Sequence, residues 1–303
     1  MSQRSDFLKL HLVIFLWGLT AAIGKEIDLS ATQLVLIRSF LAAGLLSVLL
    51  DSRARISPKL ALALAANGAL LGLHWVLFFL AVKIANVSIC MVGMATVSFW
   101  TALLEPLMIR KRRFKWVQFA LGAVVIGGVY LIYQTESQFH TGIFVALMAA
   151  IAATVFSIIN GQLSHRADDD VIVMYEMAGS AAFCGSAILV APLFATDLSS
   201  DRWWLTLEEW GWLTFLVVVC TVFAYRLYVS LLERLSVYTI NFANNLEPIY
   251  GIVIGAIFYH DHANVGWGFY TGTAAIVAAV ILQPRLARDE SQANASEEAT
   301  SGA

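Results

Sequence analysis

The sequence is a succession of apolar runs, each long enough to cross a membrane, with short polar breaks between them. A helix rises about 1.5 Å per residue, so about 20 apolar residues match the roughly 30 Å thickness of a hydrocarbon core. Ten such runs occur, and they occupy residues 7–24, 32–50, 60–80, 87–109, 115–133, 142–162, 171–194, 210–232, 237–259 and 266–283. The pattern predicts an all-α polytopic membrane protein with ten transmembrane helices. Because the breaks leave no room for a folded domain outside the membrane, we expect its function to lie within the bundle.

The composition agrees with a membrane protein and limits the chemistry. Hydrophobic residues make up 59% of the chain and charged residues 13%, whereas soluble domains carry about 25% charged residues. Cys90, Cys184 and Cys220 all fall within apolar runs, so neither a disulfide framework nor a metal site is expected, and no cofactor is indicated. The polar, acidic residues after Pro284 predict a disordered cytoplasmic tail over 284–303.

Lysine and arginine are distributed unevenly between alternate breaks, which predicts the orientation in the membrane. If the N-terminus is cytoplasmic, 14 basic residues lie inside and three lie outside. The inside set is Arg4, Lys9, Arg53, Arg55, Lys59, Arg110, Lys111, Arg112, Arg113, Lys115, Arg166, Arg234, Arg285 and Arg288, and the outside set is Lys25, Lys83 and Arg202. The bias predicts a multi-pass protein of the inner membrane with both termini in the cytoplasm.

The two halves of the sequence match weakly when the chain is compared with itself at an offset of about 151 residues. Residues 81–89, AVKIANVSI, fall on 232–240, LERLSVYTI, and Trp116 falls on Trp267. The match implies two repeats of five helices, over 7–133 and 142–283. Five is odd, so the second repeat enters the membrane in the opposite orientation, which is the inverted arrangement that secondary transporters use to build a site at mid-membrane.

An ordered set of segments resembles the EamA family of the drug/metabolite transporter superfamily. The segments are FLWGLTAAIGK, LIRSFLAAGLL, AVKIANVSI, FAYRLYVSLLERLS and NNLEPIYGIVIGAIF, and the resemblance runs from about residue 7 to 283. It implies two inverted five-helix EamA repeats around a central cavity, and alternating-access transport of small metabolites, among them amino acids. One departure concerns the fourth run, where many members carry a proline and this chain has Thr96 and Val97.

The ninth run carries a polar stripe in an apolar setting. Asn241, Asn244 and Glu247 recur every three residues and so lie on one helical face. Pro248 has no N–H group, which predicts a kink and an unpaired carbonyl group at Asn244. Two interpretations remain open: these polar groups face a substrate cavity, or they join helices by hydrogen bonds within the bundle.

Glu247 needs a partner, and Arg226 is the candidate that the sequence offers. The eighth and ninth runs form a hairpin turning near Arg234, with Arg226 about 12 Å up one leg and Glu247 about 18 Å up the other. A cation and an anion on one wall suit a zwitterion, but a permanent ion pair is equally compatible. Arg38 and Glu176, which are also deep in apolar runs, are expected to form interior ion pairs that serve packing.

The repeat offset brings further residues to corresponding positions. His74 falls on Tyr225 and Trp75 on Arg226, so the third and eighth runs are expected to face one another across the cavity with aromatic surfaces. His74 either accepts protons near neutral pH or is a buried neutral histidine bonded to a backbone carbonyl group. Adding Trp17 and Asn160 from the matching first and sixth runs, the candidate substrate-binding residues are His74, Trp75, Tyr225, Arg226, Asn244, Glu247, Trp17 and Asn160.

The features together favour a secondary transporter of a small polar or zwitterionic metabolite, such as an amino acid or a derivative. No phosphate-binding loop occurs, so ATP is not expected to drive it directly. Two alternatives are a membrane-embedded enzyme acting on lipid or peptide and a non-transporting sensor. The sequence contains no paired metal-ligand motif in any apolar run, which speaks against the enzyme. We expect no catalytic residues. The expected partners are the substrate, the bilayer and protons as candidate coupling ion, but no nucleic acid, because the basic cluster 110–115 sits in a short loop that faces the inner leaflet. A monomer and a homodimer remain open.

Overall fold

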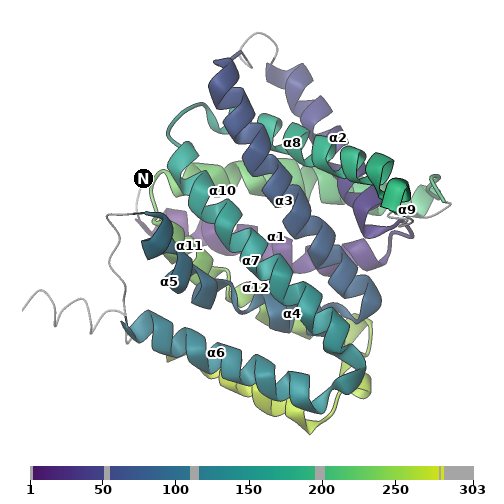
Figure 1. The fold of residues 1–303 in the computed structure, drawn as a ribbon, viewed down its shortest axis with the longest axis vertical. Helices are drawn as coiled ribbons and strands as arrows, with labels where there is room; N and C mark the ends of the chain where they lie inside the picture. Colours follow the sequence, from purple (N-terminus) through teal and green to yellow (C-terminus); the bar gives the residue numbers. More distant parts are fainter. Residues whose placement is uncertain (1–2, 51–54, 110–115, 195–201, 280, 283–303) are drawn as a thin grey trace, which may run out of the picture.

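The structure is a computed structural model that describes residues 3–50, 55–109, 116–194, 202–279 and 281–282. The basic cluster 110–115 and the predicted tail 284–303 lie outside the described residues. None of the described residues forms a strand. The helices are α1 (Gln3–Lys25), α2 (Ala31–Leu50), α3 (Pro58–Ile84), α4 (Val87–Met94), α5 (Val97–Met108), α6 (Trp116–Thr135), α7 (His140–Leu163), α8 (Asp169–Val190), α9 (Leu207–Phe215), α10 (Ala224–Leu232), α11 (Val237–Ala243) and α12 (Leu246–Phe258), followed by a helical stretch over 267–279 (Figure 1).

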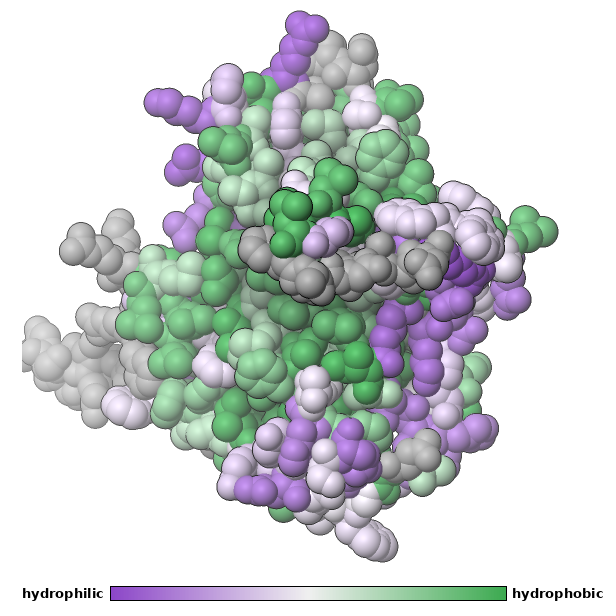
Figure 2. All heavy atoms as spheres, turned by 45° about the vertical axis from the view of Figure 1, so that its right-hand side comes forward, coloured by the Kyte–Doolittle hydropathy of each residue, from purple (hydrophilic) through white to green (hydrophobic). Residues whose placement is uncertain are grey.

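Eight segments of the described chain are long and apolar enough to cross a membrane. They correspond to the first eight of the ten predicted runs, and the chain is accordingly a polytopic membrane protein. The ninth run is divided into α11 and α12, which are each too short to count alone. Figure 2 shows hydrophobic side chains over the middle of one face of the molecule and hydrophilic ones toward its margins, which is the distribution that a bilayer requires.

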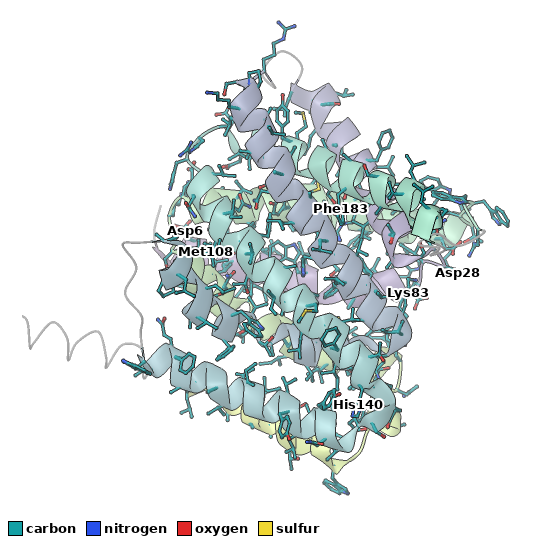
Figure 3. The ribbon with its side chains drawn as sticks, viewed as in Figure 1. Asp6, Asp28, Lys83, Met108, His140 and Phe183 are labelled. Atoms are coloured by element: carbon teal, nitrogen blue, oxygen red, sulfur yellow. The ribbon has the colours of Figure 1, made fainter. Side chains whose placement is uncertain are left out.

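The chain passes repeatedly between two opposite margins of the molecule. Figure 3 shows Asp6 and Met108 at one margin and Asp28 and Lys83 at the other. Asp6 lies near the start of α1, and Asp28 follows its end. Lys83 lies near the end of α3, which packs against α2, α7 and α8 at the centre of the bundle. The first four predicted runs therefore alternate in direction.

Two glycines bring α3 and α8 into backbone contact. A Cβ atom at Gly68 would lie 2.0 Å from the carbonyl oxygen of Glu176, and one at Gly179 would lie 2.0 Å from that of Ala65. Backbone atoms cannot rotate away as a side chain can, so this crossing requires residues without a Cβ atom. The crossing holds Glu176 directly against α3, where Asn67 precedes Gly68.

The helix α6 and the stretch 267–279 lie side by side as a layer beside the rest of the bundle (Figure 1). Their backbones meet at Gly128 and Gly272, where an added Cβ atom would lie 2.8 Å and 2.6 Å, respectively, from the carbonyl oxygen of the other glycine. The layer has a hydrophobic cluster of its own, separate from the main core and shared with α4 and α7. It consists of Ile89, Val92, Ala95, Val125, Val129, Ile132, Ile143, Phe269, Ile276 and Ala279.

Two of the predicted runs are interrupted near their middle. The fourth is divided into α4 and α5 at Ala95 and Thr96, and the ninth into α11 and α12 at Asn244 and Asn245. α4 packs against α12, so the two interrupted helices are neighbours. Interruptions at mid-membrane depth are tolerated where the backbone is buried in protein or borders a cavity.

The interruption of the ninth run differs in one detail from the sequence-based expectation. Pro248 was expected to leave the carbonyl group of Asn244 unpaired, but the backbone N–H of Glu247 donates to it at 2.9 Å. The prediction of a free acceptor is therefore wrong, because the chain tightens into a shorter turn just before the proline and pairs the carbonyl group there.

Candidate functional site

A cavity of about 80 Å³ lies at the centre of the bundle. Its walls come from α1, α2, α3, α7 and α10 and from both interrupted helices. The lining residues are Trp17, Thr20, Arg38, Leu71, His74, Trp75, Phe78, Met94, Val97, Ala153, Phe156, Ser157, Tyr225, Tyr228, Asn241, Asn244 and Glu247. None of the described residues of α6 or of 267–279 borders it. A cavity with aromatic walls and a few polar groups is typical of small-molecule binding.

Aromatic rings form one side of the cavity. The ring centres of Tyr225 and Tyr228 lie 5.6 Å apart with the rings stacked, and Trp17 packs on Tyr228 at 5.1 Å. Phe156 lies 6.1 Å from Tyr225. The first and eighth runs therefore meet at the cavity through rings, which offer a ligand apolar faces and, in the tyrosines, polar hydroxyl groups.

The interrupted ninth run supplies the polar end of the cavity. Glu247, in the first turn of α12, is 8% exposed, and no hydrogen bond or ion pair to its carboxyl group occurs among the described residues. The side-chain oxygen of Asn244 also lacks a hydrogen-bond partner in the described part of the chain. Asn241 differs, because it accepts from Ser157 at 2.9 Å and donates to Thr101 at 3.0 Å. Glu247 and Asn244 are thus acceptors available to a ligand, whereas Asn241 joins helices.

Arg226 does not join Glu247. Its side chain is 45% exposed and pairs with Asp170 at the start of α8, where the Nη2 to Oδ2 distance is 2.9 Å. It does not appear in the cavity wall, so the predicted pair is wrong. Counting residues from the hairpin turn predicts how far along its helix Arg226 lies, but not which way its side chain points. Successive helical residues point about 100° apart, and it is the preceding residue, Tyr225, that faces the cavity.

His74 and Tyr225 border the same cavity, together with Trp75. The Nδ1 atom of His74 lies 3.0 Å from the carbonyl oxygen of Ala149. Since a carbonyl oxygen only accepts, Nδ1 carries the proton in the neutral ring and Nε2 is an acceptor. This contact agrees with the interpretation of His74 as a buried histidine bonded to the backbone.

Asn160 lies behind the cavity and acts on it through Tyr225. Its Nδ2 atom donates to the Tyr225 hydroxyl group at 2.9 Å, and that hydroxyl group donates to the carboxylate of Glu176. Asn67 donates to the other oxygen of Glu176 at 2.7 Å. Glu176 is therefore held by neutral donors and not by an opposite charge, which corrects the expected ion pair. The chain of bonds fixes the position of the Tyr225 ring.

Arg38 is a cavity residue that the sequence analysis assigned to packing. It is 1% exposed, and its guanidinium group lies 3.7 Å above the ring of Trp75. Its Nε atom donates to the Thr221 hydroxyl group at 2.6 Å. The expected ion pair is wrong here as well, because the described residues give Arg38 an aromatic ring and a hydroxyl group as neighbours. An arginine inside an apolar run was a visible signal, but nothing in the sequence showed which way it faces.

Thr221, which accepts from Arg38, lies in a widened helical turn. Residues Leu216–Phe223, between α9 and α10, are π-helical, and the Thr221 hydroxyl group donates to the carbonyl oxygen of Leu216 at 2.7 Å. Its oxygen then accepts from Arg38. Such π-helical turns are frequent at functional sites, but their positions are not evident in the sequence.

Contacts at one margin of the molecule join α1, α4 and α12 beyond the cavity. Asp261, which follows α12, accepts from the backbone N–H of Ser88 at 3.1 Å and from its hydroxyl group at 3.2 Å. Lys25 lies 3.8 Å from Asp261 and 4.1 Å from the ring centre of Tyr259. Tyr259 donates to Glu26 at 2.6 Å. We call these five residues the terminal latch.

The comparisons with known proteins agree with a transporter. The model of the EamA-like transporter family matches residues 7–134 and again 140–283. The chain is 25% identical over 250 residues to the biotin transporter of Escherichia coli K12, with 81% of each chain covered, and equally to that of Escherichia coli O157:H7. A solved crystal structure resembles the fold with a TM-score of 0.67 at 16% identity, over 95% of this chain and 99% of that one. The chain thus belongs to the EamA-like transporter family, within the drug/metabolite transporter superfamily.

Proposed function

We propose that the protein is a secondary transporter that moves a small polar or zwitterionic metabolite across the inner membrane by alternating access. The observation that carries the proposal is the central cavity, where an interrupted helix presents the carboxyl group of Glu247 and the amide oxygen of Asn244 beside aromatic rings, neither with a hydrogen-bond partner in the described part of the chain. Polar groups without partners are costly inside a membrane protein, and a ligand that supplies donors offsets that cost. An amino acid or a derivative is our leading substrate class, and the name of the curated relatives adds biotin as a compound to test.

The architecture that we propose has ten spans in two inverted repeats, over 7–133 and 142–283, with both termini in the cytoplasm. Support comes from the family model, which matches twice, and from the two interruptions, which fall in the fourth and ninth of the ten predicted runs. These two runs correspond at the repeat offset. Discontinuous helices at corresponding positions of two repeats are typical of secondary transporters.

The substrate contacts that we propose are made by Trp17, His74, Trp75, Tyr225, Asn244 and Glu247. Asn160 is a positioning residue, because it holds the hydroxyl group of Tyr225. Arg226 has no contact role, since it pairs with Asp170 at a more exposed position.

The terminal latch suggests how access alternates. Opening the cavity toward that margin requires α1 and α12 to separate, and with them the contacts of Asp261 to Lys25 and of Tyr259 to Glu26. The interruptions at Ala95 and Asn245 are natural hinges, because backbone that is already irregular bends at low cost. The margin of the latch is the external one in the orientation that the basic residues predict.

Uptake into proteoliposomes tests the proposal. Purified protein is reconstituted, and the accumulation of radiolabelled biotin and of a panel of amino acids is compared with that in protein-free liposomes. A pH gradient, applied and then collapsed with an uncoupler, tests protons as the coupling ion. Release of product from lipid extract without solute flux would instead favour a membrane-embedded enzyme. Ligand binding without flux would favour a sensor.

A further inference from the structure

We propose that Arg38 is an anion-binding subsite that receives the carboxylate group of the molecule occupying the cavity. The inference deepens the transporter proposal and rests on it for the physiological role. It assigns the ligand a carboxylate at a defined end of the site. The sequence had placed the cationic group at Arg226, which does not line the cavity.

Arg38 is a buried cation that no carboxylate neutralises among the described residues. The side chain is 1% exposed in the middle of a transmembrane segment, and the described residues provide no carboxylate within ion-pair distance. The buried carboxylate of Glu176 instead accepts from Asn67 and Tyr225. A buried guanidinium group without a counter-charge is among the most costly features of a membrane protein. An anionic ligand in the cavity supplies the missing charge.

The guanidinium group of Arg38 is fixed in place while part of it remains unused. The Trp75 ring covers one face at 3.7 Å, and Thr221 accepts from Nε at 2.6 Å. The two terminal amino groups have no hydrogen-bond partner among the described residues, and Arg38 borders the cavity. A planar fork with both terminal groups free matches the two oxygens of a carboxylate. The group is therefore preorganised for bidentate binding.

Hydrogen-bond donors and acceptors of the cavity come from different elements. Arg38 offers only donors, whereas Glu247 and the side-chain oxygen of Asn244 offer acceptors. They come from different elements, α2 for the donors and the interrupted ninth run for the acceptors. A molecule with a carboxylate at one end and an amino or amide donor at the other satisfies both. Amino acids have this arrangement, and so does biotin with its carboxylate and ureido group.

Matched acids and amides test the subsite on the unmodified protein. Phenylalanine is compared with phenylalaninamide and biotin with biotinamide, with binding measured by thermal shift in detergent and flux measured in proteoliposomes. We expect at least one acid to stabilise the protein and its amide to bind about tenfold to a hundredfold more weakly, because a charge-assisted pair is lost. Equal stabilisation by acid and amide, or stabilisation by neither, overturns the subsite.

Variants then assign the selectivity to Arg38. Arg38→Gln should remove the preference for the acid, and Arg38→Lys should reduce it, since an ammonium group keeps the charge but not the fork. Arg226→Gln is the matched control, because it removes the same charge outside the cavity and should retain the preference. Persistence of the preference in Arg38→Gln, or its loss in Arg226→Gln alone, refutes the assignment.

The experiments distinguish a failure of the Arg38 subsite from a failure of the transporter proposal. If Arg38→Gln does not accumulate, the acid and amide comparison on the unmodified protein and on Arg38→Lys still decides. Flux of neutral solutes with no preference for acids contradicts the subsite and leaves the transporter proposal intact. Selective binding of an acid without flux contradicts transport and supports the subsite.

Discussion

Replacement of Gly68 by alanine tests whether the backbone contact between α3 and α8 holds the bundle together. The new Cβ atom would lie 2.0 Å from the carbonyl oxygen of Glu176, and contacts below 3.0 Å are essentially never seen, so the helices must separate by about 1 Å. Overpacking of this kind costs about 1–3 kcal/mol, and the upper end applies because backbone atoms cannot rotate away. Alanine is favoured over glycine within a helix by about 1 kcal/mol, which leaves a net loss of about 2 kcal/mol.

The assay is thermal unfolding of the purified protein in detergent, where this loss corresponds to a drop of about 3 °C. Gly44→Ala and Gly127→Ala are the matched controls, because a Cβ atom at either position meets nothing within 4 Å. Both controls should be as stable as the original protein or slightly more stable. If Gly68→Ala unfolds at the same temperature as the two controls, α3 and α8 are not held in backbone contact and the reasoning fails.

Three further changes test the site and the terminal latch. Glu247→Gln should accumulate normally, because no cation is left unpaired, but should lose flux in proteoliposomes; normal uptake would show that the carboxyl group is not needed. Tyr225→Phe removes the hydroxyl group between Asn160 and Glu176 and should lower the free energy of unfolding by about 1–3 kcal/mol, measured by thermal unfolding. An unchanged stability would contradict the bonded chain. Asp261→Asn weakens the contacts with Ser88 and Lys25 and should lower the midpoint of thermal unfolding, and an unchanged midpoint would argue against the latch.

The sequence predicted most of the helices because membrane thickness imposes a length on apolar runs, and it predicted much of the cavity because polar residues inside such runs must face one another. Asn244 and Glu247 border the cavity as their spacing of three indicated. Pro248 predicted an interruption of the ninth run, and the structure has one just before the proline, between α11 and α12. The division at Thr96 carries no proline and no comparable signal.

The choice between two arginines could not be made from the sequence. Arg226 was the better candidate by distance along the hairpin, and Arg38 had no identifiable partner. Which one faces the cavity depends on the rotation of α2 and α10, and that is set by their neighbours. Arg38 is held by Trp75 and Thr221. Arg226 is held by Asp170. These contacts join residues far apart in the chain, so the sequence alone does not reveal them.

The layer formed by α6 and the stretch 267–279 has a practical consequence. It has a hydrophobic cluster of its own and contributes no described residue to the cavity wall. Its lipid-facing side chains, such as Tyr130 and Trp267, are exposed in the isolated molecule. A spectroscopic label attached to this face would therefore sit in the lipid and leave the binding site open to ligand.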